Sequence, residues 1–423
     1  MQDCKRVYRY MKDPLLILVL IMAFLQSRSS AKIFRDDKLH ADFQTSNTDF
    51  ALEIYKRLTK KSTDGNLFYS PFSISAAMSM VYLGAREQTA AQMVPALSIQ
   101  SLDQRVHEAY EDYLKVVLAR SENVTLQIAN RLYPDIKTEI VPSFIDLCAK
   151  HYLADTKAMD YGQFEAARRE INDWVSKQTA EKIQDLLPQG SLNPLTVMVL
   201  VNAIYFKGDW ETKFDDKVTK DMTFHSLKGQ EKTVKMMFQK ATKFPLKHDD
   251  ELKCEVLELP YKGNSLSMVI ILPDDRDGLS ALEEKLTPSA LKGLMTDMPP
   301  IKVEVFLPKF KLKSGFELSE VFQQMGMKDL FDKTKADLSG IDASRMSYVS
   351  AIFHQAFVDV NEEGTEAAAA TAVRMMKRSL PRPPLQFKAD HSFMFVIKDN
   401  RSDTILFVGR FVDVVETRVK DEL

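Results

Sequence analysis

The chain has 423 residues, of which 45% are hydrophobic and 27% are charged, and its formal net charge is −2. This balance is typical of a soluble globular protein and gives no basis for nucleic-acid binding or for charge-driven attachment to a membrane surface. The length allows more than one domain, but no Pro/Gly/Ser-rich linker, internal repeat or long charge run divides it. We therefore expect one large domain.

The first segment, residues 1–30, has the pattern of a secretory signal peptide. Basic residues at positions 5–12 precede an apolar run of eleven residues from Leu15 to Leu25, and small and polar residues follow it. A membrane anchor is the less favoured alternative, because a bilayer-spanning helix needs about 20 apolar residues. We expect cleavage near Ser30 and no membrane insertion.

Helices are expected to dominate the first half of the domain. Apolar residues recur at every fourth position across 47–59, which predicts an amphipathic helix. Residues 66–71 predict a short strand, and its last two residues can begin the next helix. Ser70 can cap that helix, and Pro71 would occupy its first position, where a missing N–H costs nothing. Residues 170–187 predict another helix.

Strands are expected to dominate the second half. Residues 198–206 are rich in Val, Ile and aromatic side chains, as in a strand that is buried on both faces. The polar residues 398–401 predict a turn between the last two strands. Helices in the first half and strands in the second predict an α+β fold with one large sheet. The further elements expected are strands at 267–272, 302–306, 387–397 and 404–414, and a helix at 316–325.

Five stretches stand out: NLFYSPFSI at 66–74, VNAIYFKGDW at 201–210, NEEGTEAAAAT at 361–371, FKADHSF at 387–393 and LFVGR at 406–410. Together they resemble the serpin superfamily, and the resemblance extends over about residues 49–414. It implies an α+β serpin fold with about nine helices, three β-sheets and an exposed reactive loop at about 361–384, all in one domain spanning 31–419. It also implies that the cut loop inserts into the main sheet as an additional strand.

The stretch that matches the serpin hinge has the small side chains that insertion requires. Alternate positions from Thr365 to Thr371 are Thr or Ala, whereas a large or charged side chain on that face would overpack the sheet or bury an unpaired charge. Taken alone, the Ala run would predict an ordinary helix, but the flanking motifs favour an inserting strand. The hinge residues are Glu362, Glu363, Gly364, Thr365, Glu366, Ala367, Ala368, Ala369, Ala370 and Thr371.

The length of the loop predicts the bond that a protease cuts. Inhibitory serpins place the cut residue fourteen positions after the hinge glycine, which is Arg378 here, so the reactive bond is Arg378–Ser379. An extended segment of that length covers roughly 46 Å at about 3.3 Å per residue. An acylated protease would therefore be pulled to the far end of the sheet and away from its aligned catalytic groups.

The basic bait indicates the protease class. Specificity is expected from Arg374, Met375, Met376 and Lys377, which suit a pocket lined by carboxylates. Furin-type proprotein convertases fit, although they also prefer a basic residue four positions before the cut, where Met375 stands. A cut after Lys377 would place Arg374 correctly but puts a poorer residue at the bond. A trypsin-like protease would accept Arg378 as well.

The resemblance also assigns residues that hold the sheet closed. Ser70, Asn202 and His354 match the serpin shutter, and Trp210 matches the region near the top of the opening. No nucleophile elbow, metal-ligand spacing or phosphate loop is present, so we expect no enzyme activity, cofactor or metal. Few basic residues cluster after Gly84, so activation by glycosaminoglycans is not expected.

The last four residues of the chain predict the compartment in which the protein works. Lys420, Asp421, Glu422 and Leu423 match a retention signal, which predicts binding to the KDEL receptor and residence in the endoplasmic reticulum lumen or early secretory pathway, with partial secretion. The leading prediction is a protease inhibitor, and the alternative is a non-inhibitory chaperone serpin of that compartment. Glycosylation is predicted at Asn123 and Asn400, and Cys148 and Cys254 are expected to be free core thiols.

Overall fold

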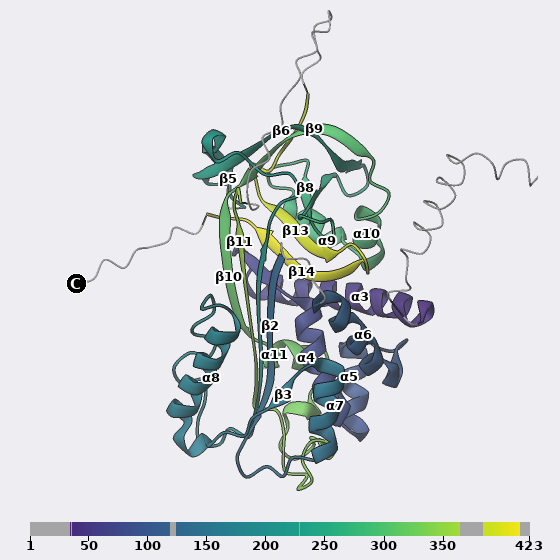
Figure 1. The fold of residues 1–423 in the computed structure, drawn as a ribbon, viewed down its shortest axis with the longest axis vertical. Helices are drawn as coiled ribbons and strands as arrows, with labels where there is room; N and C mark the ends of the chain where they lie inside the picture. Colours follow the sequence, from purple (N-terminus) through teal and green to yellow (C-terminus); the bar gives the residue numbers. More distant parts are fainter. Residues whose placement is uncertain (1–33, 35, 119–123, 228, 364–383, 415–423) are drawn as a thin grey trace, which may run out of the picture.

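Nine α-helices and two β-sheets make up the part of the chain that this computed structural model describes, residues 34, 36–118, 124–227, 229–363 and 384–414 (Figure 1). None of the described helices is both long and apolar enough to cross a membrane. The helices are α3 (Asp37–Lys61), α4 (Pro71–Gly84), α5 (Glu87–Ala96), α6 (Val106–Leu118), α7 (Pro142–Tyr152), α8 (Phe164–Gln178), α9 (Leu279–Lys285), α10 (Pro288–Leu294) and α11 (Ser319–Gln324).

The five-stranded sheet, called the main sheet below, has the order β10-β11-β4-β2-β3. At its centre β11 and β4 run parallel, with Ala351 opposite Val199 and Val358 opposite Phe206. Antiparallel pairs flank this parallel pair on both sides. The strands are β10 (Phe310–Glu317), β11 (Ala351–Val360), β4 (Met198–Gly208), β2 (Val124–Pro134) and β3 (Asp155–Thr156).

The second sheet has nine strands, and β6 explains why two sheets are found where three were expected. Over its 19 residues, β6 pairs with β7 near its end and with β5 and β9 before that, so it joins two groups of strands into one sheet. Its strands are β1 (Leu67–Tyr69), β14 (Thr404–Phe411), β13 (Phe393–Asp399), β8 (Leu266–Pro273), β7 (Cys254–Pro260), β6 (Glu231–Asp249), β9 (Pro300–Pro308), β12 (Leu385–Lys388) and β5 (Lys220–His225).

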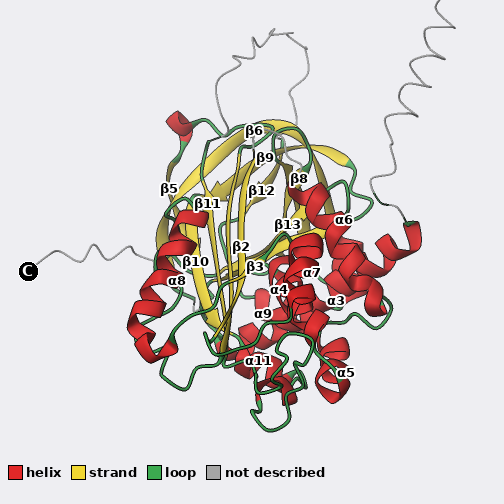
Figure 2. Ribbon diagram, turned by 60° about the horizontal axis from the view of Figure 1, so that its bottom comes forward, coloured by secondary structure: helices red, strands yellow, loops and turns green. Residues whose placement is uncertain are grey.

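The main sheet separates two hydrophobic cores. Helix α8 lies on one face, where Ile171 and Val175 pack with Val199 and Val201 of β4 (Figure 2). Helices α3 to α7 and the second sheet lie toward the other face and enclose the larger core. All of the first nine residues of β4 are buried, which confirms the prediction of a strand covered on both sides.

The local signals around α4 were sufficient to predict its start. The Ser70 hydroxyl accepts a hydrogen bond from the Ser73 N–H at 3.1 Å, and Pro71 is the first helical residue. The helix predicted over 47–59 is present but begins earlier, at Asp37, because Asp36 caps it there with bonds from the N–H groups of Lys38 and Leu39.

Two predicted helices are shorter than expected. The helix predicted over 170–187 ends at Gln178, because Ala180 and Glu181 adopt positive φ values and the Thr179 hydroxyl accepts a hydrogen bond from the Ile183 N–H. The prediction over 316–325 was wrong at its start. Phe316 lies in β10, and only Ser319–Gln324 is helical.

The strand predicted over 387–397 is two strands. β12 pairs with β9 and β13 pairs with β8, so the chain must change neighbours between them. His391 fixes this passage, since its Nε2–H donates to the Pro273 carbonyl at 2.8 Å.

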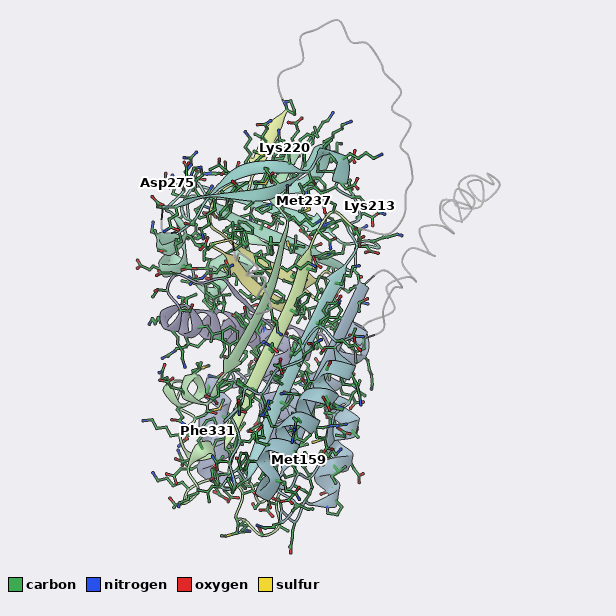
Figure 3. The ribbon with its side chains drawn as sticks, turned by 90° about the vertical axis from the view of Figure 1, so that its left-hand side faces the viewer. Met159, Lys213, Lys220, Met237, Asp275 and Phe331 are labelled. Atoms are coloured by element: carbon green, nitrogen blue, oxygen red, sulfur yellow. The ribbon has the colours of Figure 1, made fainter. Side chains whose placement is uncertain are left out.

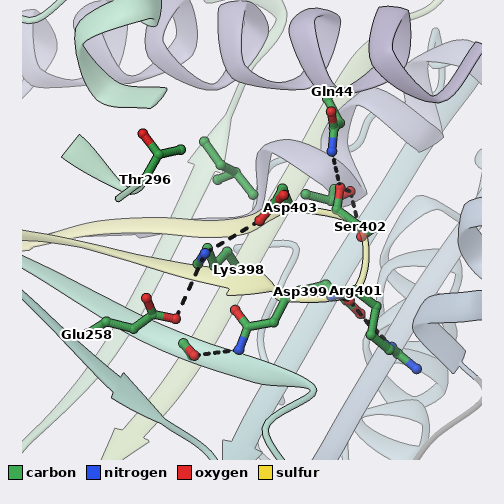
Figure 4. Close-up of polar contacts among 12 residues, drawn as sticks. Gln44, Glu258, Thr296, Lys398, Asp399, Arg401, Ser402 and Asp403 are labelled. Atoms are coloured by element: carbon green, nitrogen blue, oxygen red, sulfur yellow. Dashed lines mark hydrogen bonds and ion pairs between the residues drawn. The ribbon is translucent and has the colours of Figure 1, made fainter. Parts of the chain in front are cut away.

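The turn predicted over 398–401 is largely buried at its start. Asp399 is buried, and its carboxylate accepts hydrogen bonds from Arg401. The carbonyl of the next residue, Ser402, accepts a hydrogen bond from the side chain of Gln44 in α3 at 2.7 Å (Figure 4). The turn is thereby tied to α3. Elsewhere, Cys148 and Cys254 are buried and free, as predicted.

Candidate functional site

The parallel β4–β11 pair, called the seam, is the central feature of the candidate site. The chain leaves the main sheet at Val360, the last residue of β11, and enters the second sheet at Leu385, the first residue of β12. A segment following β11 that folded back into the seam would run antiparallel to both β11 and β4. It would replace one parallel pair with two antiparallel pairs, which are slightly more stable per residue.

A buried hydrogen-bond network crosses the seam at mid-height. His354 of β11 lies directly opposite Asn202 of β4, and its Nδ1 bonds to the Asn202 Oδ1. The Ser70 N–H donates to His354 Nε2 at 3.2 Å, and the Ser70 hydroxyl donates to the Leu406 carbonyl at 2.6 Å. The structure therefore brings together Ser70, Asn202 and His354 and ties both strands of the seam to α4.

The network requires a neutral histidine. Complete burial lowers the pKa of His354 to about 3, and the two bonds fit the tautomer in which Nδ1 donates and Nε2 accepts. A proton on Nε2 would face the N–H of Ser70 and break that bond. His354 is thus a structural group and not a general base.

The sequence analysis missed two members of the network, Ser73 and Asn130. Asn202 donates through Nδ2 to the carbonyl of Ser73 at 3.1 Å and also to Oδ1 of Asn130. Asn130 lies opposite Asn202 in β2, so a row of polar side chains crosses three strands at one level. A polar residue inside a strand was the available signal, but its partner could be known only from the register.

Trp210 lies at the end of the seam where β11 ends. Its Nε1–H donates to the Asn361 carbonyl at 2.9 Å, and its ring stacks on Tyr261 with centroids 4.5 Å apart. Trp210 therefore fixes the main chain at Asn361, directly after the end of β11.

The first hinge residue is held by a group called the hinge latch, formed by Glu362, Lys309 and Thr219. The Glu362 carboxylate pairs with Lys309 Nζ at 2.7 Å and accepts from the Thr219 hydroxyl at 2.8 Å. Burial raises its pKa, but the bonds from Lys309, the backbone and Thr219 outweigh burial, so the pKa is below its ordinary value. The exposed Glu363 reaches Lys207 at 3.3 Å. Lys309 and Thr219 lie outside the matching stretches, and Lys207 lies within the stretch 201–210, but none of their contacts with Glu362 or Glu363 could be predicted.

The remaining predicted residues lie largely outside the described ranges. Asn400 is described, and its Nδ2 donates to the Asn264 carbonyl at 3.1 Å and to the Ser267 hydroxyl at 2.6 Å. A glycan on that nitrogen would replace one of these bonds, and glycosylation there stays a prediction. The residues outside the description are 1–30, Asn123, Gly364–Thr371, Arg374–Ser379 and Lys420–Leu423.

Comparisons with known proteins agree with this geometry. A family model described as Serpin (serine protease inhibitor) matches residues 45–414. The Homo sapiens leukocyte elastase inhibitor is 44% identical over 374 residues, covering 87% of this chain and 98% of the relative. Homo sapiens Serpin B8 is 42% identical over 373 residues, covering 88% and 99%. The crystal structure of uncleaved ovalbumin superposes with a TM-score of 0.80 at 30% identity, covering 88% and 99%.

Proposed function

The chain belongs to the serpin family of serine protease inhibitors, and from that premise we propose that it traps proteases that cut after paired basic residues, furin-type convertases first. It acts in this proposal as a suicide substrate and not as an enzyme. The observation that carries the proposal is the seam, a parallel pair at the centre of the main sheet that a segment following β11 would fill.

The chemistry of the trap belongs to the protease. Its serine Oγ attacks the carbonyl carbon of Arg378, the Arg378–Ser379 C–N bond breaks, and the new amine of Ser379 leaves with the proton that the serine gave up through the protease histidine. An ester then joins the protease to Arg378. Hydrolysis by water would release both proteins, so inhibition requires that this second step be stopped.

The fold supplies the means to stop it. Arg378 lies fourteen positions after Gly364, and insertion of the segment 365–378 would carry the esterified protease roughly 46 Å at about 3.3 Å per residue. The catalytic serine would be pulled away from its base and oxyanion hole, and each of these groups contributes strongly to deacylation. A cut after Arg374 would leave the segment four residues short and favour release.

The bait sets the proposed target. Lys377 and Arg378, with Arg374 nearby, match a pocket lined by carboxylates, whereas the named relatives include inhibitors of leukocyte elastase. The target is therefore inferred from the bait and not taken from these names. A trypsin-like protease satisfies the same chemistry at Arg378.

We place the protein in the lumen of the endoplasmic reticulum as part of the same proposal. The basic and apolar pattern of residues 1–30 and the Lys420–Leu423 sequence support it. Imaging of the tagged full chain, with a variant that lacks residues 420–423, tests it, and a distribution that does not depend on those four residues would contradict retention.

The function is tested by mixing the protein with furin, and separately with trypsin, followed by a denaturing gel. We expect a covalent band and a released fragment that begins at Ser379, and an Arg378→Ala variant should lose both. Cleavage without a covalent band would mean that the chain is a substrate. Resistance to both proteases would favour the chaperone alternative.

A further inference from the structure

Two buried histidines, called the histidine pair below, face each other where α6 packs on α7. His107 of α6 is 6% exposed and His151 of α7 is 7% exposed, and their ring centroids are 6.2 Å apart. Helix α7 leads through β3 to Met159, which marks one end of the molecule in Figure 3, whereas Lys220 marks the opposite end, beside Thr219 of the hinge latch. The trap proposed above uses neither histidine.

The histidine pair is incompletely hydrogen-bonded. Nδ1 of His107 bonds to the Tyr152 hydroxyl at 2.5 Å, but its Nε2 is buried and has no partner among the residues that the structure describes. Nδ1 of His151 lies 3.1 Å from the Glu111 carboxylate, an arrangement that becomes an ion pair when the ring is protonated. Buried polar atoms nearly always have a partner, so a buried nitrogen without one calls for an explanation.

The surroundings keep both rings neutral at neutral pH. Burial, and then the neighbouring His151, lower the pKa of His107 to about 4. Burial and Lys150 lower the pKa of His151, against the opposing effects of Glu111 and Glu108. Carboxylates therefore support a charge on His151 but not on His107.

The other groups around the histidine pair supply no opposing charge. Tyr82 of α4 stacks on His107 with ring centroids 5.7 Å apart, and Tyr152 meets the same ring edge-on at 5.9 Å. Asp103 acts on the Tyr82 hydroxyl and on neither histidine. Protons on both rings would therefore place two like charges in one buried interface, only one of them beside a carboxylate. Burial raises the pKa values of the neighbouring phenols and thiol, which belong to Tyr82, Tyr110, Cys148 and Tyr152.

The interface between α6 and α7 is connected to the seam. Tyr152 lines a cleft of about 500 Å³ together with Asn130 of β2, and Asn130 accepts a hydrogen bond from Asn202 in the network that crosses the seam. Helix α4, whose Ser70 and Ser73 also belong to that network, packs on both α6 and α7. Separation of α6 from α7 would therefore remove support from β2 and α4 together.

We propose that the histidine pair is a proton-sensitive catch, which holds α6 and α7 together at neutral pH and lets them separate when both rings become charged. The separation loosens the network that closes the seam, and a seam that has opened can be filled by another strand. An uncut molecule held in acid therefore loses its ability to trap proteases. The catch itself goes beyond the proposed function, and only its effect on trapping rests on that function.

The first test is hydrogen exchange of the backbone amides of α6 and α7 in the full chain, at pH 7.5 and pH 5.5, corrected for the intrinsic effect of pH on exchange. The variant is His107→Gln, which stays neutral at both pH values and can keep a hydrogen bond to Tyr152. If it does not fold, His151→Gln removes the same repulsion from the other helix. The control is His248→Gln, which removes an exposed histidine that pairs with Asp274.

We expect the opening equilibrium of α6 and α7 in the wild type to rise at least about tenfold from pH 7.5 to pH 5.5. The open state binds the proton at its ordinary pKa of 6.5 and the closed state does not, so each pH unit below that value adds about a factor of ten. The rise should be about tenfold smaller in His107→Gln and unchanged in His248→Gln. A rise in His107→Gln equal to that of the wild type, or no rise in the wild type, would overturn the proposal.

The second test measures trapping after exposure to acid. Each protein is kept at pH 5.5, returned to pH 7.5 and mixed with trypsin, and the covalent band is quantified on a denaturing gel. The wild type should lose trapping activity about tenfold faster than His107→Gln. Equal loss in the two proteins would overturn the connection between the catch and the seam. A wild type that forms no complex even before acid exposure would refute the proposed function, while hydrogen exchange would still decide whether the catch exists.

Discussion

At the scale of single residues, the buried histidine of the seam makes stability depend on pH. Burial lowers the pKa of His354 to about 3 from an ordinary value of 6.5. Between these values the unfolded chain binds the proton and the folded chain does not. The contribution of His354 is therefore complete above pH 6.5 and is lost as the pH falls toward 3, by about 1.4 kcal/mol per pH unit.

We predict that replacing this histidine reduces the acid sensitivity of folding. Between pH 7 and pH 5 the free energy of unfolding should fall by about 2 kcal/mol less in His354→Gln than in the wild type. Urea unfolding at both pH values measures the difference. The control His248→Gln should act in the opposite direction, because the hydrogen bond that His248 donates to Asp274 raises the pKa of His248. Equal losses in the wild type and His354→Gln would contradict the prediction.

The hinge latch predicts unequal effects for two neighbouring glutamates. The Glu362 side chain is 10% exposed and pairs with Lys309, whereas Glu363 is 71% exposed where it reaches Lys207. Glu362→Gln should lower the free energy of unfolding by about 1–2 kcal/mol, since the buried Glu362 side chain loses its ion pair with Lys309. Glu363→Gln should change it by less than about 1 kcal/mol. Urea unfolding of both variants checks this, and equal effects would show that burial of the latch is unimportant.

At the scale of elements, strands β4 and β11 set the requirements for whatever enters between them. Successive side chains of an extended strand point to opposite faces of a sheet. After insertion, Thr365 and Glu366 would therefore lie on opposite faces of the main sheet. We predict that Thr365→Arg converts the inhibitor into a substrate, because the arginine would be buried unpaired on insertion. Glu366→Arg, the matched control on the other face, should keep more than half of the covalent complex. Gel bands after reaction with trypsin measure both, and undiminished trapping by Thr365→Arg would refute insertion in this alternation.

The elements also show what could be predicted from the sequence. Signals that act within a few residues were reliable, such as the cap at Ser70 and the apolar run of β4. Elements that depend on distant partners were not. The turn after Gln178 follows from backbone conformation at Ala180, and the length of β6 follows from its pairing with three other strands.

In the candidate site, too, residues with a local signal could be predicted and residues that depend on distant partners could not. Ser70 and Asn202 could be found because they lie in stretches that match the family, and His354 through its match to the serpin shutter. The structure brings the three residues together. Asn130 contacts Asn202, which lies 72 residues away in the sequence, and Lys309 contacts Glu362, which lies 53 residues away. No local pattern marks such partners, since strand register and sheet order alone decide them.

At the scale of the whole molecule, cutting the loop should stabilise the protein. Insertion would give the main sheet a sixth strand with bonds to both β4 and β11, and each new hydrogen bond contributes about 0.5–1.5 kcal/mol. We predict that cleavage at Arg378 raises the unfolding temperature by at least about 10 °C. Calorimetry before and after cleavage measures it, with cleaved Thr365→Arg as the control that should show no rise. An unchanged temperature for the cleaved wild type would mean that the loop stays outside the sheet.

The seam has a consequence for populations of molecules. The seam accepts a strand through backbone hydrogen bonds and small side chains. Neither feature distinguishes a strand of the same molecule from a strand of another copy. A loop donated by a second copy would leave that copy's own seam vacant for a third. Such contacts are head-to-tail, and where the rotation between copies does not close a ring they propagate into chains whose growth rises with concentration. The retention proposed above would raise that concentration, and the bond between His354 and Asn202, which holds the seam closed, would then also favour solubility.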